Sequence, residues 1–232
     1  MKNRKMGIIG AMSEEVELLH RHVEVTQKHE KAGLTLYEGT LHGRDVVYGK
    51  SGVGKVNAAV CTQFMIDLGA GGICFTGVAG ALDPELEIGD LVISSSCVQH
   101  DMDASPLGFA RGEVPFQEVS DYAADGTLVE LARQTGERLF PGRCLVGKVL
   151  SGDQFIASRE SVQMLREEMG GACVEMEGAA LAQVCWMNGT PFVVIRSMSD
   201  KADGSAQVNF ETFTQEAADR SYRFVSALVE AL

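Results

Sequence analysis

Short apolar runs alternate along the chain with stretches in which apolar residues recur every three or four positions. The short runs predict β-strands near residues 6–11, 34–41, 44–50, 72–78, 89–98, 144–150 and 190–198. The periodic stretches predict helices that begin after Ser13 and near residue 56, followed by helices near 125–139, 158–168, 177–187 and 210–231. Such alternation is typical of a mainly parallel or mixed sheet with helices on both faces. We therefore predict an α/β fold.

The helix near residue 56 shows the clearest apolar face. This face consists of Val56, Val60, Phe64 and Leu68, which recur every four residues. Gly69 follows and is the expected C-terminal stop, because glycine adopts the left-handed backbone that ends many helices. We expect this face to pack on the sheet.

Residues 100–120 show no clear period and contain prolines and glycines. A structureless segment of this length in a compact domain is usually a functional loop, a disordered region or an interface element. Its apolar members, Leu107 and Phe109 among them, argue against disorder. We interpret the segment as a loop that covers another surface.

Composition limits the class of protein. The 232 residues are 45% hydrophobic and carry a net charge of −12. We predict one domain over residues 1–232, without a membrane span, because no apolar run approaches about 20 residues. The negative charge argues against nucleic-acid phosphates as partners but does not exclude a nucleoside. The short apolar run after the basic N-terminus is a poor signal peptide, so we predict a cytoplasmic protein.

Cysteine and histidine spacing indicates no metal site. The six cysteines form no Cys-x-x-Cys pair and lie mostly in apolar runs, which predicts buried thiols in a reducing compartment. His20 and His22 are two residues apart and would point in different directions on a helix. We predict neither a metal ion nor a cofactor.

Carboxylates follow three of the apolar runs. Glu15 comes after the first strand, Glu175 and Glu177 lie between an apolar run and a helix, and Asp200 ends the strand near 190–198. Burying a carboxylate costs free energy unless it is paired, so such positions are often functional. Each alone could be a helix or turn cap. Together they indicate an acid/base active site.

Three glycine-rich segments lie near the ends of predicted strands. Gly49–Lys55 nearly matches a nucleotide-binding P-loop, but Val56 stands where a hydroxyl would bind Mg²⁺, so we interpret it as a strand-to-helix turn. Small residues in 76–82 and 151–156 would let a ligand approach the backbone. The alternatives are a close-packed turn at 76–82 and a core position, rather than stacking on a base, for Phe155.

The order of these motifs resembles the 5′-methylthioadenosine/S-adenosylhomocysteine nucleosidases of the nucleoside phosphorylase superfamily. Seven motifs span essentially the whole chain: Ile-Ile-Gly-Ala-Met-x-Glu-Glu at 8–15, Ser-Gly-Val-Gly-Lys at 51–55, Thr-Gly-x-Ala-Gly at 76–80, His-Asp-x-Asp at 100–103, Ser-Gly-Asp-x-Phe-Ile at 151–156, Val-Glu-Met-Glu at 174–177 and Ser-Asp at 199–200. The resemblance implies a three-layer α/β/α fold with a central mixed sheet, a homodimer, a role in methionine salvage, and hydrolysis of the adenine–ribose bond of methylthioadenosine, S-adenosylhomocysteine and 5′-deoxyadenosine.

The resemblance also implies two catalytic residues. Glu15 falls where the family places the carboxylate that activates water, and Asp200 where it protonates the leaving adenine. N-glycosidic cleavage passes through an oxocarbenium-like state and needs such an acid and base. No metal is required.

Five further positions match the family's substrate contacts. Phe155 would stack on adenine, and the backbone of Ile156 would read its edge. Met176 and Glu177 would contact the ribose, with Glu177 on its hydroxyls, and Gly80 would lie by the sugar and the water. These assignments predict one nucleoside pocket.

Two positions depart from the family pattern. Val78 stands where some members carry serine, so a hydrogen bond near the water is in doubt. Leu107 stands where an aromatic residue is frequent, within the 104–115 segment that helps to form the 5′-substituent pocket of the neighbouring subunit. The preferred 5′ substituent therefore stays open.

Three other functions are alternatives to the hydrolase. A phosphorylase would need an arginine in the loop after the first strand, but residues 10–15 contain none and include two anions that would repel phosphate. A non-catalytic nucleoside binder would not need Glu15, Glu177 and Asp200 together. A futalosine-type nucleosidase remains an alternative, because some family members accept aminodeoxyfutalosine.

Overall fold

The computed structural model describes residues 4–202 and 206–232, without the side chains of residues 14, 15, 206–215, 217 and 218. The strands are β1 (Lys5–Gly10), β2 (Glu24–Lys31), β3 (Leu34–Leu41), β4 (Arg44–Lys50), β5 (Ala70–Ala81), β6 (Leu91–Gln99), β7 (Asp121–Ala123), β8 (Cys144–Ser151), β9 (Gly171–Glu175) and β10 (Phe192–Asp200). The helices are α1 (Ser13–His22), α2 (Lys55–Asp67), α3 (Gly126–Leu139), α4 (Arg159–Met169), α5 (Gly178–Asn188) and α6 (Ala206–Ala231), with a 3₁₀ turn, η1, at Ser105–Leu107.

All ten strands belong to one mixed sheet in the order β10-β6-β8-β9-β5-β1-β4-β3-β2, with β7 beside β6. Strand β10 also pairs with β5, so β5, β9, β8, β6 and β10 close into a ring. The β5–β10 and β8–β9 pairs are parallel, whereas β5–β9 is antiparallel. This arrangement brings the ends of β5, β8, β9 and β10 close together.

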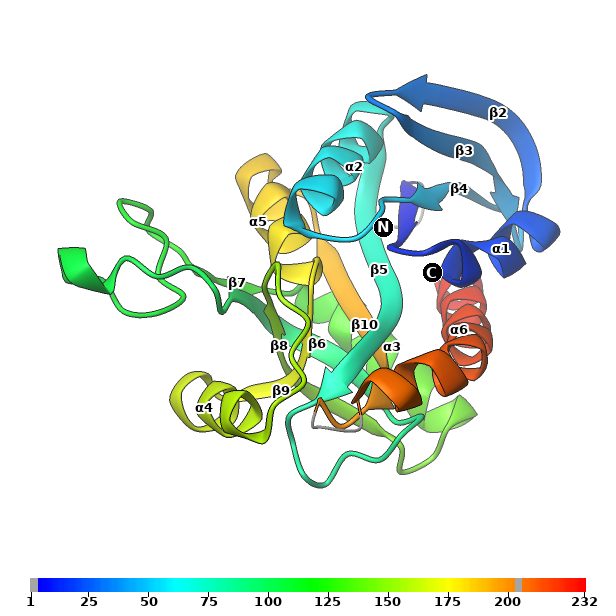
Figure 1. Cartoon of the computed structure of the whole chain (residues 1–232). Coiled ribbons are helices and arrows are strands. Elements are labelled where there is room, and N and C mark those ends of the chain that lie inside the picture. Colours follow the sequence, from blue (N-terminus) through cyan, green and yellow to red (C-terminus); the bar gives the residue numbers. More distant parts are fainter. Residues whose placement is uncertain (1–3, 203–205) are drawn as a thin grey trace.

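Helices cover both faces of the sheet, which confirms the predicted three layers (Figure 1). Side chains alternate across a strand, so neighbouring residues enter different cores. Ile8 belongs to the core under α1, α3 and α6, and Ile9 to the core under α2 and α5. In β10, Val193 belongs to the core under α1, α3 and α6, and Val194 belongs to the core under α2 and α5. None of the described helices is long and apolar enough to span a membrane.

The strands predicted at residues 34–41 and 44–50 are confirmed, and they form a hairpin. Strands β3 and β4 pair in antiparallel fashion, and His42 and Gly43 between them both have positive φ angles, 53° and 74°. Mirror-image two-residue turns of this kind match the twist of the strands they join.

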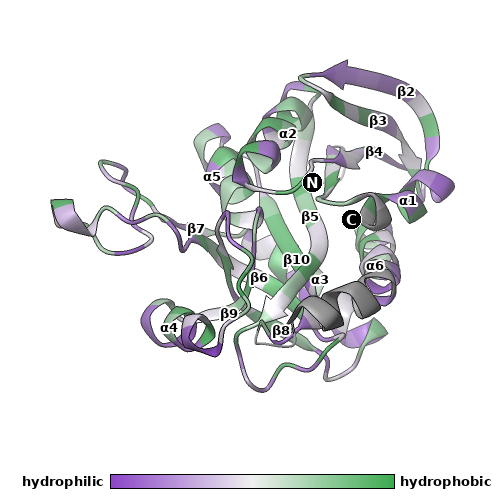
Figure 2. Cartoon of the chain, viewed as in Figure 1, coloured by the Kyte–Doolittle hydropathy of each residue, from purple (hydrophilic) through white to green (hydrophobic). Residues whose placement is uncertain are grey.

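The sequence pattern missed β2, β7 and β9. Strand β2 is an edge strand that pairs with β3 alone, and nearly all its side chains are exposed. Figure 2 shows it as largely hydrophilic, unlike β10. An edge strand without a buried face has no alternating apolar pattern to detect. Strands β7 and β9 are short, and their sequences alone do not predict a strand. Each forms by pairing with a neighbour, β7 with β6 and β9 with β8.

The predicted apolar face of α2 is wrong in part. Phe64 is buried, but Val56 and Val60 are 74% and 42% exposed. The buried positions of the helix are Ala58, Cys61, Thr62, Phe64 and Met65. The buried face of α2 is therefore rotated away from Val56 and Val60, which lie on the surface. Gly69, with φ of 88°, does follow the end of the helix as predicted.

The predicted loop at residues 100–120 is confirmed as irregular apart from the 3₁₀ turn η1. It projects from the body of the molecule between β6 and β7 (Figure 1). Leu107 is 73% and Phe116 is 92% exposed. The segment 76–82, by contrast, is not a turn, because Thr76–Ala81 continues β5 between its partners β10 and β9.

Candidate active site

A cavity of about 200 Å³ lies where β5, β9 and β10 end, closed on one side by the segment that follows β8. Its lining comprises Ala11, Met12, Val53, Val78, Ala79, Gly80, Gln154, Phe155, Ile156, Val174, Glu175, Met176, Glu177, Arg196, Ser199 and Asp200. Residues far apart in the sequence meet here because the strand ring brings their elements together. Ligands of α/β proteins commonly bind at such strand ends.

The cavity brings together most of the site residues predicted from the sequence: Gly80, Phe155, Ile156, Met176, Glu177 and Asp200. The side chain of Glu15 lies outside the described residues. Its backbone belongs to the first turn of α1, shortly after Met12, which lines the cavity. The six predicted residues therefore lie around one cavity, and their individual roles stay predictions.

One end of the cavity holds a buried ion-pair cluster. Arg196 lies between two carboxylates: its Nε donates to Glu175 Oε2 at 3.1 Å, and its Nη2 is 3.9 Å from Glu177 Oε2. Its guanidinium also lies over the Phe75 ring, with Cζ 4.2 Å from the ring centroid. A buried charge is tolerated when it is paired and hydrogen-bonded, and this cluster meets that condition.

Glu175 organises the start of α5. Its carboxylate accepts the backbone N–H of Glu177 at 3.2 Å and that of Gly178 at 2.9 Å, and it also accepts the Ser151 hydroxyl. The Ala179 N–H donates in turn to Ser151 Oγ at 2.7 Å. These bonds satisfy N–H groups that the first helical turn leaves unpaired. Glu175 thus fixes both Arg196 and the backbone that carries Glu177.

Glu177 itself reaches across to another helix. Its Oε1 accepts the Gly54 N–H at 2.8 Å, immediately before the first residue of α2. A helix N-terminus carries partial positive charge and stabilises an anion. Arg196 adds a full positive charge on the other oxygen. Both contacts stabilise the negative charge of the Glu177 carboxylate at this end of the cavity.

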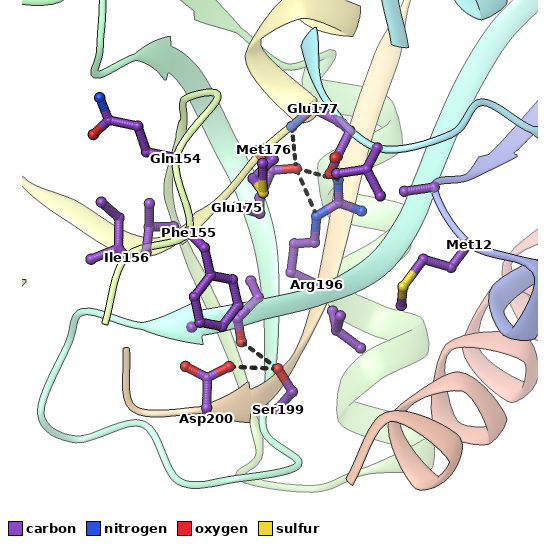
Figure 3. A pocket seen from close by; sticks show the side chains of 16 residues that line it. Met12, Gln154, Phe155, Ile156, Glu175, Met176, Glu177, Arg196, Ser199 and Asp200 are labelled. Atoms are coloured by element: carbon purple, nitrogen blue, oxygen red, sulfur yellow. Dashed lines mark hydrogen bonds and ion pairs between the residues drawn. The ribbon is translucent and has the colours of Figure 1, made fainter. Parts of the chain in front are cut away.

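The opposite end is formed by Asp200, which is buried at the end of β10. Its Oδ1 accepts the Ala202 N–H at 2.7 Å, and its Oδ2 accepts the Ser199 hydroxyl at 2.8 Å. Gly80 pairs with Asp200 across the two strands, and a Cβ there would lie 2.9 Å from Asp200 Oδ1. Glycine is therefore needed beside this carboxylate. Phe155 lies on the same side of the cavity in Figure 3.

The chain matches the sequence pattern of the phosphorylase superfamily over residues 5–230. A 5′-methylthioadenosine/S-adenosylhomocysteine nucleosidase of Chromohalobacter salexigens is 43% identical to it, covering 99% of this chain and 98% of the relative. The corresponding nucleosidase of Geobacillus kaustophilus is 41% identical, covering 98% and 97%. This chain belongs to that nucleosidase family.

Solved structures of the family have the same fold. The nucleosidase of Neisseria meningitidis in complex with methylthio-immucillin-A superposes with a TM-score of 0.94 at 38% identity, covering 99% of this chain and 100% of the other. The native structure of futalosine hydrolase of Helicobacter pylori also superposes with a TM-score of 0.94, at 33% identity, covering 100% and 99%. The predicted fold class and family are confirmed.

The sequence pattern marks Glu175 as one of the site carboxylates but gives no role to Arg196 or Ser199, both of which line the cavity. A signal for Arg196 existed: it is the one cation inside the nine-residue apolar strand Phe192–Asp200, and a charge in such a strand must find a buried partner. Glu175, two residues before Glu177, supplies that partner. The sequence offers no comparable signal for their mutual distance, which depends on the sheet order.

Proposed function

We propose that this cavity is the nucleoside site of an N-glycosyl hydrolase. The enzyme is a nucleosidase that cleaves 5′-methylthioadenosine and S-adenosylhomocysteine to adenine and the thioribose. The observation that carries the site assignment is the placement of Asp200 and Glu177 at opposite ends of one cavity, with Phe155 exposed on its wall. One domain over residues 1–232, without a metal or cofactor, is sufficient for this chemistry.

Asp200 is the proposed acid that protonates the leaving adenine. It must hold a proton beforehand, and its side chain is buried at the end of β10. The Ser199 hydroxyl supports either state: it bonds to Asp200 Oδ2 at 2.8 Å and lies 3.4 Å from the Ala79 carbonyl oxygen. When Asp200 is protonated, the Ser199 hydroxyl can rotate so that its hydrogen points to the Ala79 carbonyl oxygen. The Ser199 hydrogen and the Asp200 proton then do not face each other.

Glu15 is the proposed base that takes a proton from the attacking water. Glu177 accepts hydrogen bonds from the ribose hydroxyls, with Met176 against the sugar. Arg196 supports this role because its guanidinium, which stays protonated at ordinary pH, lies 3.9 Å from Glu177 and stabilises its negative charge. Adenine would stack on Phe155 and bond to the backbone of Ile156. Gly80 leaves room for the sugar beside Asp200.

The substrate range extends beyond the two thio-nucleosides in this proposal. 5′-Deoxyadenosine shares the adenine and ribose groups that the cavity would recognise. The likeness to futalosine hydrolase of Helicobacter pylori supports aminodeoxyfutalosine as a further substrate. A purine nucleoside phosphorylase is less well supported, because residues 10–15 contain no arginine to bind phosphate.

We further propose a homodimer in the cytoplasm, acting in methionine salvage and without nucleic-acid or membrane partners. Large apolar side chains are exposed on the 100–116 loop and on α2 and α5: Leu107, Phe116, Val56, Val60, Trp186 and Met187. Such a concentration is unusual on a monomer surface and supports an interface. In this arrangement Leu107 would reach the 5′-substituent pocket of the neighbouring subunit. The six free cysteines suit a reducing compartment.

The deciding assay measures adenine release from methylthioadenosine, S-adenosylhomocysteine, 5′-deoxyadenosine and aminodeoxyfutalosine, each with and without phosphate. A hydrolase releases free ribose derivatives at a rate that phosphate leaves unchanged. Formation of a ribose 1-phosphate derivative would instead identify a phosphorylase.

A further inference from the structure

The N-terminus of α2 is capped by carboxylates from other parts of the chain. Its N-cap residue is Gly54, which has no side chain to offer, and its first turn contains no acidic residue. The Gly54 N–H donates instead to Glu177 Oε1, and the Lys55 N–H to Asp153 Oδ1, both at 2.8 Å. Two N–H groups at one helix end thus hold the proposed ribose-binding residue and the segment that carries Phe155.

The turn at residues 152–153 also contacts the residues that follow β6 and the last residue of β9. The Asp153 N–H donates to Asp101 Oδ2 at 2.9 Å, and the Gly152 N–H donates to the Glu175 carbonyl oxygen at 3.1 Å. The buried His100 ring packs against Gly152 so closely that a Cβ there would lie 2.4 Å from His100 Nε2. His100 and Asp101, the two residues that follow β6, therefore contact the consecutive residues Gly152 and Asp153 of the turn.

The Lys55 side chain closes these contacts into a ring. Its Nζ donates to Asp101 Oδ1 at 2.6 Å and to Gln99 Oε1 at 3.0 Å. Lys55 and Asp101 are only 17% and 14% exposed. The ring runs from Lys55 Nζ to Asp101, from Asp101 to the Asp153 N–H, and from the Asp153 carboxylate back to the Lys55 N–H.

The ionisation of Asp101 matches this geometry. Burial acts to raise its pKa, but the hydrogen bonds from Lys55 and from the Asp153 N–H act in the opposite direction and leave the pKa below its ordinary value. The carboxylate is thus charged near neutral pH and can bond to both donors. An ion pair this well shielded is stronger than an exposed one, because water screens it less.

We propose that Lys55 and Asp101 are a positioning pair for the nucleoside site. Neither side chain lines the cavity, so the pair acts through Asp153, two residues before Phe155. It sets the distance between the Phe155–Ile156 segment and the α2 N-terminus that holds Glu177. The inference rests on the proposed adenine and ribose contacts. It assigns a role to Lys55 and Asp101, which belong to the 51–55 and 100–103 motifs and take no direct part in the proposed reaction.

The test compares Lys55→Met and Asp101→Asn with wild-type protein. A shift of the adenine-binding segment weakens ground-state and transition-state binding alike, so KM for methylthioadenosine and the dissociation constant of adenine should each rise about tenfold. The kcat should change less than about threefold. Because both residues act on one contact, the double variant should be no worse than the more damaging single variant. Lys55→Arg, which keeps the cation, should recover most of the affinity.

Lys5→Met is the matched control. Lys5 is also largely buried, at 22% exposure, and its Nζ also bonds to one carboxylate, Glu38 at 2.8 Å, and to one uncharged oxygen, the Leu68 carbonyl at 3.0 Å. It lies in β1 and does not line the cavity. Lys5→Met should lower the melting temperature as Lys55→Met does while leaving KM and adenine affinity unchanged.

A Phe155→Ala variant separates failure of this inference from failure of the proposed site. If Phe155→Ala leaves adenine affinity intact, the proposed adenine contact is wrong. If Phe155→Ala weakens adenine binding but Lys55→Met and Asp101→Asn lower only the melting temperature, the pair is purely structural and the positioning role is overturned.

Discussion

The two ends of the cavity hold carboxylates in opposite surroundings. Glu177 faces a guanidinium and the N-terminus of a helix, both of which favour the anion. Asp200 is buried at a strand end, where its carboxylate accepts hydrogen bonds from the Ser199 hydroxyl and the Ala202 backbone N–H. In the proposed reaction one of these carboxylates accepts hydrogen bonds from the ribose and the other exchanges a proton. Their different surroundings, rather than their residue types, would then separate the two roles.

Removing the proton at the Asp200 end should have the largest effect. Asp200→Asn keeps the shape but cannot protonate the leaving adenine, so kcat should fall by roughly 10² to 10⁴-fold. Glu15→Gln should lower kcat to a similar extent, since it cannot take a proton from water. The dissociation constant of a stable adenosine analogue, measured by calorimetry, should change far less. Near-normal turnover of Asp200→Asn would show that Asp200 is only a turn residue.

Removing the charge at the Glu177 end should have a smaller effect of a different kind. Glu177→Gln keeps one acceptor but replaces the other oxygen by an NH₂ group that faces Arg196 or a ribose hydroxyl. We expect kcat/KM to fall by roughly 10- to 100-fold, consistent with loss of a charged hydrogen bond worth about 1.5–3 kcal/mol. Analogue affinity should fall together with the rate. If affinity is unchanged while kcat collapses, Glu177 acts in proton transfer and the contrast between the two ends disappears.

The carboxylates at the two ends of the cavity, Glu177 and Asp200, could be predicted from the sequence, but the contacts that distinguish their surroundings could not. Asp200 and Glu177 were found because carboxylates beside apolar runs are costly unless they work. The identity of their neighbours depends on which strands pair, and Arg196 meets Glu175 only because β10, β5 and β9 adjoin in the strand ring. The link between Lys55 and Asp101 likewise joins residues 46 positions apart through side chains alone.

Most of the fold was predictable where an element buries one face. The hairpin around His42 and the strand ending at Asp200 follow from local patterns that tertiary packing did not overrule. Strand β2 was missed because its exposed side chains carry no alternation. The face of α2 was misjudged because Val56 and Val60 repeat at helical spacing whether they face a core or another surface.

A smaller change tests the space beside Asp200 rather than its proton. In Gly80→Ala the new methyl would lie 2.7 Å from the Ala202 Cβ and 2.9 Å from Asp200 Oδ1, so the carboxylate must shift. We expect kcat to fall about tenfold and stability to fall by about 1–3 kcal/mol, the usual cost of overpacking. Urea unfolding and steady-state kinetics measure the two effects. Unchanged kinetics would mean that the position of Asp200 is not critical.

The smallest effect is expected on the loop, which is separate from both ends of the cavity within one chain. Leu107 is 73% exposed and lines no part of the described cavity, so Leu107→Ser should change the free energy of unfolding by less than about 0.5 kcal/mol. If the loop of one subunit covers the 5′ pocket of the other, KM for methylthioadenosine should nevertheless rise about three- to tenfold, as expected for loss of a small apolar contact. Adenine affinity should stay constant, because both proposed adenine contacts come from the 152–156 segment. Sedimentation at micromolar concentration provides the control: a fully active wild-type monomer would contradict the dimer, and with it any role for Leu107 in a neighbouring site.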